Sequence, residues 1–179
     1  MAELVKKEAK EKRSCKDEAL FWLEYGDRTE KEMVQHLKKK DYDEREIAEC
    51  MAFLVDLSFI DDRRYALKFV EVSMEKGRGP LRIRHELAEK GIAGAIAEEA
   101  LAELYDRQTE REIALEVAEK AFRAIQRDWD LSEEEQEYDD WGNPILPKLS
   151  EKEKAKIARK LATAGFSSGA TYDAINRLK

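Results

Sequence analysis

One pair of adjacent acids is the first place in this sequence to look for chemistry. Asp61 and Asp62 carry neighbouring carboxylates, which can bind a metal ion or exchange protons with a substrate. They directly precede a run of residues with helical apolar periodicity, and carboxylates at that place commonly cap a helix and favour its dipole. We therefore interpret Asp61 and Asp62 as capping residues.

The cysteines and histidines are too few to build a reactive or metal centre. Cys15 and Cys50 stand 35 positions apart and cannot supply a four-ligand zinc site or a disulfide framework by themselves. His36 and His85 fall at different places in the repeat described below, so they do not form a repeated site. We therefore expect no catalytic residue, no metal and no cofactor, and the protein is not expected to be an enzyme.

A glycine-rich segment, Lys76-Gly77-Arg78-Gly79-Pro80, has some features of a phosphate-binding loop. It lacks the spacing and the terminal Lys-Ser/Thr of a nucleotide loop, and no strand precedes it, so we interpret it as a tight turn that starts a helix. The basic residues in and after it either form a solvated face or contact an anionic surface. A comparable basic cluster follows later in the chain, at Lys154, Lys156, Arg159 and Lys160.

Composition limits the class of protein. The 179 residues are 41% charged and 42% apolar, which excludes a wholly disordered chain, and no apolar run approaches the roughly 18 residues of a membrane span. No secretory signal begins the sequence, so we expect a cytoplasmic protein without a membrane partner. The net charge of −7 reflects residues 128–140, which hold eight acids and no base and leave 33 bases against 32 acids elsewhere.

A three-fold internal repeat is the main structural signal in the sequence. With Leu37, Leu87 and Leu161 as anchors, apolar residues recur four positions before and five, fourteen and seventeen positions after each anchor. Position +4 is Asp41, Gly91 or Gly165, types that tolerate the left-handed conformation at a helix end. Position +13 is always small: Cys50, Ala100 or Ala174. Each unit is thus predicted to contain two amphipathic helices joined by a short apolar turn.

A further helix precedes each pair, at 16–25, 62–75 and 110–127, which makes three-helix units. The sequence therefore predicts an all-α fold of three tandem three-helix repeats forming an elongated, curved array. We expect an N-terminal tail at 1–14, helical repeats at 15–60, 61–107 and 108–179, and an acidic insert at about 128–147 within the third repeat. Trp22 and Tyr65 are interpreted as packing residues, whereas Trp129 and Trp141 either fasten the insert to the helices or anchor a partner.

The junction of the first two units resembles the RecX family of regulatory proteins. The resemblance is carried by Asp61-Asp62-x-x-Tyr65-Ala66, by Lys76-Gly77-x-Gly79-Pro80 and by Leu87-x-x-Lys90-Gly91. It is strong over about residues 18–105, moderate over 148–179 and absent from the acidic insert. It assigns structural roles to the motif residues Asp61, Asp62, Tyr65, Gly77, Pro80 and Gly91.

The resemblance implies a monomeric regulator, inhibitory as family members usually are, that binds the groove of the RecA–DNA filament and modulates ATP hydrolysis, strand exchange and coprotease activity. Single- or double-stranded DNA is a second implied partner. The alternative is a DNA-binding protein built from helix-turn-helix-like units. The residues expected to bind filament or DNA are Lys76, Arg78, Arg82, Arg84, Lys90, Lys154, Lys156, Arg159 and Lys160.

The acidic insert is expected to lie outside the fold, because its composition cannot bury a core. Replacing residues 128–147 by a short Gly/Ser linker should leave helicity and the midpoint of thermal unfolding nearly unchanged. Circular dichroism during heating checks this expectation. A loss of cooperative unfolding would show that Trp129, Trp141 or Leu146 belongs to the core.

Overall fold

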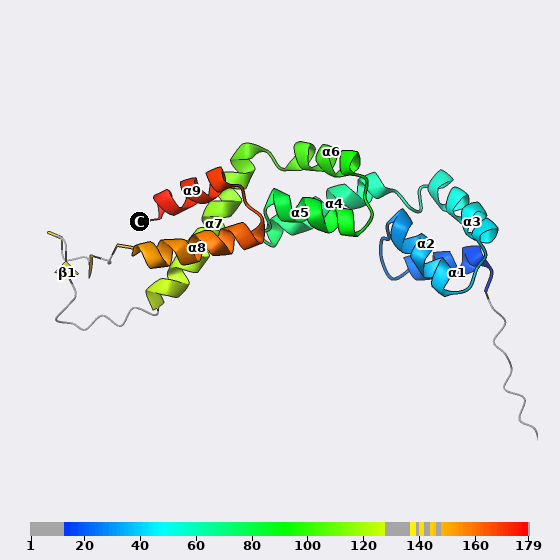
Figure 1. Cartoon of the computed structure of the whole chain (residues 1–179), viewed down its shortest axis with the longest axis horizontal. Coiled ribbons are helices and arrows are strands. Elements are labelled where there is room, and N and C mark those ends of the chain that lie inside the picture. The colour runs from blue at the N-terminus through cyan, green and yellow to red at the C-terminus, as the bar shows by residue number, and fades with distance from the viewer. Residues whose placement is uncertain (1–12, 128–136, 139, 142–143, 146–147, 179) are drawn as a thin grey trace, which may run out of the picture. The chain divides into compact units, whose positions relative to one another are not determined.

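The structure, a computed structural model, describes residues 13–127, 137–138, 140–141, 144–145 and 148–178. These residues form nine helices and one antiparallel pair of two-residue strands (Figure 1). The helices are α1 (Cys15–Leu23), α2 (Glu30–Lys39), α3 (Glu44–Asp56), α4 (Asp62–Glu75), α5 (Pro80–Glu89), α6 (Gly94–Leu104), α7 (Arg107–Arg127), α8 (Glu151–Ala164) and α9 (Ser168–Arg177). The strands are β1 (Glu137–Tyr138) and β2 (Pro144–Ile145), between α7 and α8. The all-α class with tandem three-helix units is confirmed.

The chain forms two compact units, Met1–Tyr65 and Ala66–Lys179. In the first, α1, α2 and α3 pack against one another, and the start of α4 caps α2: the Glu30 N–H donates to Asp62 Oδ1 at 3.0 Å. Asp61 Oδ1 accepts from the Arg64 N–H at 2.9 Å at the start of α4. Asp61 therefore caps α4, as predicted from the sequence, whereas Asp62, in the first turn of α4, caps α2, a partner that the sequence did not predict.

The repeat anchors lie in the core. Leu37, Leu87 and Leu161 are all fully buried, and the residues four positions before and five after each anchor are buried as well. The +13 positions, Cys50, Ala100 and Ala174, are at most 1% exposed, so each fills a slot with room only for a small side chain. The +14 and +17 positions vary, since some of them are only partly buried.

The helix ends follow the predicted signals. Thr29 with Glu32, Asp43 with Glu46 and Ser150 with Glu153 form reciprocal capping boxes. Pro80 occupies the first turn of α5. Asp41, Gly91 and Gly165 have φ angles of 59°, 88° and 89°, the left-handed conformation expected after these helices.

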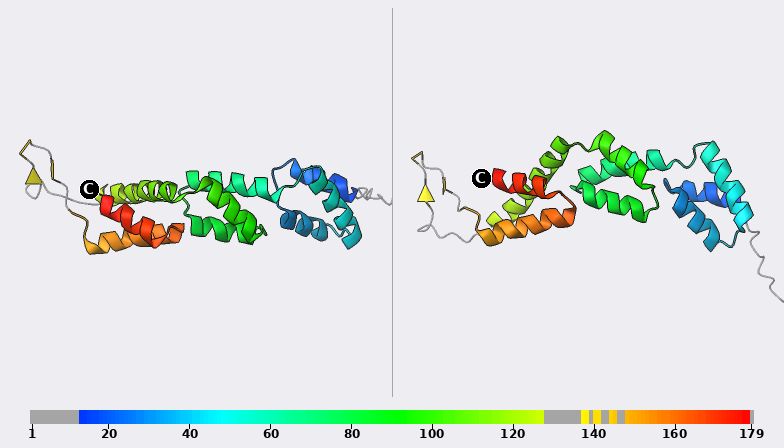
Figure 2. Two further views of the ribbon diagram at one scale, coloured as in Figure 1. Left: turned by 90° about the horizontal axis from the view of Figure 1, so that it is seen from above. Right: turned by 45° about the horizontal axis from the view of Figure 1, so that its top comes forward.

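Within the second unit, the start of α5 docks onto the end of α8. The Gly79 N–H donates to the Ala164 carbonyl at 2.7 Å, and the Leu81 N–H donates to the Gly165 carbonyl at 3.1 Å. The two helix ends meet in Figure 1 and in both views of Figure 2. A helix start has unpaired N–H groups and a helix end has unpaired carbonyls, so each end satisfies the other and the dipoles align head to tail.

This contact requires glycine on both sides. A Cβ on Gly79 would lie 2.3 Å from the Gly165 carbonyl carbon, and a Cβ on Gly165 would lie 2.5 Å from the Arg82 backbone nitrogen. Gly77, with a φ of 67°, comes equally close to α7, because its Cβ would lie 2.8 Å from Val117 Cγ2. The glycines of the Lys-Gly-x-Gly-Pro turn thus allow this turn to come close to α8 and α7.

The aromatic residues singled out in the sequence are only partly buried, are exposed, or lie outside the described residues. Trp22 is only partly buried: its ring packs at the edge of the core and stacks on His36, with ring centroids 4.0 Å apart. Tyr65 is partly buried, and Trp141 is 84% exposed. Trp129 and Leu146 lie outside the described residues.

The first prediction from the fold concerns the anchors. Leu87→Ala and Leu161→Ala should each lower the free energy of unfolding by about 2 to 5 kcal/mol, because each leaves a cavity in a closed core. Leu81→Ala is the matched control, since that side chain is 54% exposed and should cost less than about 0.5 kcal/mol. Urea unfolding of the three variants measures the differences. Equal small effects at Leu87 and Leu161 would contradict the repeat register.

The second prediction concerns the glycine contact. Gly79→Ala should lower the free energy of unfolding by roughly 1 to 3 kcal/mol, because the new methyl group must push the α5 start away from the α8 end. Gly169→Ala is the control: its Cβ would meet nothing within 4 Å, and alanine in a helix should be neutral or stabilising. Denaturant unfolding compares both with the parent protein, and a neutral Gly79→Ala variant would show that the contact is loose.

Candidate basic interaction site

A pocket of about 670 Å³ opens where the α4–α5 turn faces α7 and α8, inside the unit Ala66–Lys179. We call it the junction pocket. It is lined by Glu75, Lys76, Gly77, Arg78, Arg82, Val117, Lys120, Arg159, Lys160, Thr163 and Ala164. Six of these eleven residues are basic and one is acidic, so the pocket presents a concentrated positive charge.

The turn that carries Lys76 and Arg78 is fixed from two sides. The Gly79–Ala164 hydrogen bond holds its end against α8. On the other side the Tyr105 hydroxyl, at the end of α6, donates to the Arg78 carbonyl at 3.0 Å. Burial raises the pKa of Tyr105, so this hydroxyl keeps its proton and remains a donor. Basic residues from separate helices are thereby held at fixed places around one pocket.

The arginines of the pocket are already engaged with a carboxylate. Arg78 Nη1 and Arg82 Nε donate to the two oxygens of Glu86, the latter over 2.8 Å. Arg84, outside the pocket, forms a two-point pair with Glu98. The hydrogen bond from Arg84 holds the pKa of Glu98 below its usual value, so this carboxylate stays charged beside the arginine.

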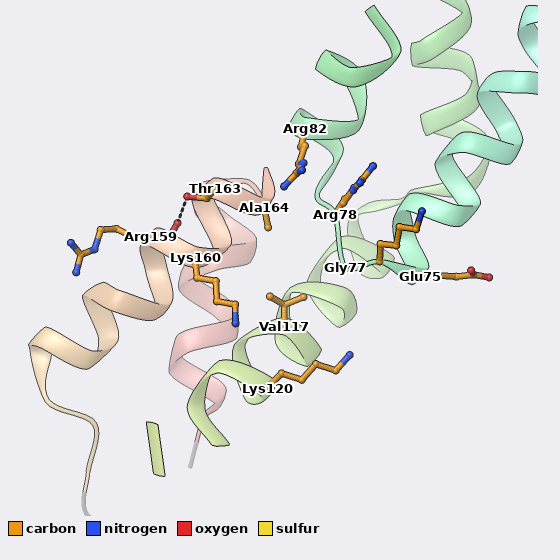
Figure 3. A pocket seen from close by; sticks show the side chains of 11 residues that line it. Glu75, Gly77, Arg78, Arg82, Val117, Lys120, Arg159, Lys160, Thr163 and Ala164 are labelled. Carbon is orange, nitrogen blue, oxygen red and sulfur yellow. Dashed lines mark hydrogen bonds between the residues drawn. The ribbon is translucent and has the colours of Figure 1, made fainter. Parts of the chain in front are cut away.

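The lysines differ from the arginines. Within the described part of the chain, the ammonium groups of Lys76, Lys120 and Lys160 have no hydrogen bond and no ion pair. Figure 3 shows Lys120 and Lys160 on either side of Val117, while Glu75 extends away from them. Arg159 Nε contacts only a backbone carbonyl, that of Ala155, at 3.3 Å. The pocket therefore has several cations that remain available to an anionic partner.

The structure brings together residues from both predicted basic clusters. The pocket contains Lys76, Arg78 and Arg82 from the middle repeat and Arg159 and Lys160 from the third. Arg84, Lys90, Lys154 and Lys156 do not line it, and Lys154 donates to Glu151 at 2.8 Å on its own helix. Binding by all nine residues remains a prediction.

Lys120 is the pocket residue that sequence reasoning missed. It lies on α7, three residues after Val117, and α7 belongs to neither predicted basic cluster. A signal existed, because Val117 and Lys120 share one face of this helix at i, i+3 spacing. Only the close approach of Gly77 to Val117 shows that this face meets the α4–α5 turn.

Within the described part of the chain, the side chains that could bind a metal ion do not gather into one site. No group of three or more His, Cys, Asp or Glu side chains in them could hold a metal ion. His36 Nε2 lies 3.1 Å from Glu18 Oε1, in a cluster where the Lys40 hydrogen bond lowers the pKa of the buried Glu18. Cys15 and Cys50 are both buried. No helix among the described residues is both long and apolar enough to cross a membrane.

Comparisons with known proteins identify the family. Residues 15–54 match the model of the first three-helix domain of RecX, and residues 61–101 match that of the second. The Regulatory protein RecX of Vibrio campbellii is 38% identical over 112 residues, which are 63% of this chain and 71% of that protein. That of Clostridium botulinum (strain Eklund 17B / Type B) is 31% identical over 90% of this chain, which spans only 65% of that relative's length.

Solved structures agree in fold. The crystal structure of RecX from Lactobacillus salivarius superposes with a TM-score of 0.74 at 30% identity, covering 92% of this chain and 94% of that one. A second crystal structure of a regulatory protein RecX gives a TM-score of 0.72 at 25% identity, covering 91% and 70%. The two domain matches, the Vibrio relative and the similar folds show that the chain belongs to the RecX family.

Proposed function

We propose that this protein regulates the RecA recombinase by binding the RecA–DNA filament, and that the regulation is inhibitory. The proposal follows from membership of a family whose relatives carry the name Regulatory protein RecX. On this proposal the protein lies in the filament groove as a monomer in the cytoplasm and modulates ATP hydrolysis, strand exchange and coprotease activity without catalysing a reaction.

The observation that carries the proposal is the cluster of cations in the junction pocket. A solvated face would not need Lys76, Lys120 and Lys160 brought from three separate elements to one concave place. Gathering like charges is unfavourable unless an anionic partner offsets the repulsion. A filament of protein and DNA presents such an anionic partner, since DNA carries a negative charge on every phosphate.

The helix-turn-helix alternative is less well supported. In such a module the last helix enters the major groove and presents polar or basic side chains to base edges and phosphates. The last helix of the middle repeat, α6, instead exposes Glu98, Glu99 and Glu103 and contains no basic residue. In the first repeat, α3 exposes Glu44, Glu46 and Glu49 and has one base, Arg45. Acidic helices would be repelled by DNA.

The test uses lysines, because their replacement breaks no ion pair among the described residues. Charge reversal at Arg78, Arg82 and Arg84 would instead place new acids beside Glu86 and Glu98 and disturb the fold. The triple variant Lys76→Gln/Lys120→Gln/Lys160→Gln should raise the concentration needed for half-inhibition of RecA ATPase on single-stranded DNA by about tenfold or more. That factor corresponds to roughly 0.5 kcal/mol for each lost charge contact.

The control variant is Lys38→Gln/Lys148→Gln/Lys152→Gln, which removes the same charge from three exposed lysines outside the pocket. It should inhibit as the parent protein does. A parent protein without effect on RecA ATPase would contradict the proposed regulation. Equal losses in the two triple variants would show that general charge, rather than the junction pocket, matters.

A further inference from the structure

We propose that the junction pocket is a binding site for clustered phosphate groups, which it recognises through the ammonium groups of Lys76, Lys120 and Lys160. The inference deepens the proposed function, since it concerns the same pocket and names the chemistry of its ligand. Phosphates of two sources share this chemistry: the backbone of a DNA strand and a free polyphosphate.

The first reason for this proposal is that contacts between the elements around the pocket hold their backbone in place. The cations come from the α4–α5 turn, α7 and α8, and contacts between these elements hold them together. Gly79 is tied to Ala164, Leu81 to Gly165, and the Gly77 backbone lies against Val117. Because the backbone segments that carry these lysines are already held together, an anion with several charges lowers the repulsion between the ammonium groups without an ordering cost to the backbone.

The second reason is the chemistry of the cations in the pocket that remain available to a ligand. A carboxylate is bound best by the two-point fork of arginine, but Arg78 and Arg82 already share Glu86. Apart from Arg159, whose guanidinium extends away from the other lining residues in Figure 3, what remains are compact ammonium groups, and lysine binds phosphate as a point charge. Several lysines around one pocket suit a ligand with several neighbouring charges better than a single acidic side chain of a protein.

The lining also limits what else the ligand can contain. Among the described residues, no aromatic side chain lines the pocket, so the lining that the structure describes offers a nucleobase no ring to stack on. The Thr163 hydroxyl donates to the Arg159 carbonyl at 2.9 Å and is engaged as a donor within its own helix. Recognition should therefore depend on phosphate charge and spacing rather than on base identity, and the pocket's 670 Å³ volume is within the usual range for a small ligand.

The experiment is titration calorimetry of the full chain, without RecA, against two probes: inorganic tripolyphosphate and a single-stranded oligothymidylate of about 15 nucleotides. The parent protein should bind at least one probe. The variant Lys76→Gln/Lys120→Gln/Lys160→Gln should lose about tenfold or more in affinity, whereas Lys38→Gln/Lys148→Gln/Lys152→Gln should stay within about twofold. Circular dichroism verifies that both variants are folded.

The two probes distinguish the sources. If the DNA backbone is the ligand, the oligothymidylate binds, and the salt slope of its affinity becomes shallower by roughly 2 in the pocket variant. If a free polyphosphate is the ligand, tripolyphosphate binds more tightly and displaces the oligonucleotide. Absence of binding by both probes, or equal losses in the two variants, would overturn the inference.

These outcomes are separable from the proposed function. A protein that inhibits RecA ATPase through the three lysines but binds neither probe would retain the proposed function and lose the phosphate site. A protein that binds a probe through the same lysines but leaves RecA unaffected would retain the phosphate site and lose the proposed function.

Discussion

Two backbone hydrogen bonds, from Gly79 to Ala164 and from Leu81 to Gly165, determine the architecture of the unit Ala66–Lys179. They join the unpaired N–H groups at the start of one helix to the unpaired carbonyls at the end of another. Neither glycine can be replaced by a residue with a side chain without a shift, because a Cβ on Gly79 or Gly165 would collide with the opposite helix end. The main chain therefore contributes directly to the contact between the middle and third repeats.

The site depends on this contact. Lys76 and Lys160 are far apart in the sequence and belong to different repeats, yet they line one pocket because the helix ends between them touch. The contact also explains why basic residues are tolerated at the start of α5, where the helix dipole disfavours cations. The α8 carbonyls occupy the place where an anion would bind, and Glu86 neutralises Arg78 and Arg82.

Much of the fold could be predicted from the sequence, because the signals that determine it are local. The anchors Leu37, Leu87 and Leu161, the capping boxes and the left-handed turn at Gly91 each depend on residues within about 20 positions, which periodicity and spacing reveal. The pocket depends on how the middle and third repeats pack against each other. No spacing rule shows that Gly77 faces Val117, so Lys120 was missed and the two basic clusters were treated as separate.

One position at which the middle repeat departs from the other two lies at this contact. At the start of the second helix, the first repeat has Thr29 and the third has Ser150, each in a capping box, whereas the middle repeat has Gly79 without a side-chain cap. A capping side chain stabilises a helix start, and its absence at Gly79 leaves the N–H groups of α5 open to another group. Here that group is the α8 terminus, and a hydroxyl-bearing residue would exclude it. At the start of α5, the missing cap therefore coincides with the contact between the middle and third repeats, and the pocket cations lie beside that contact.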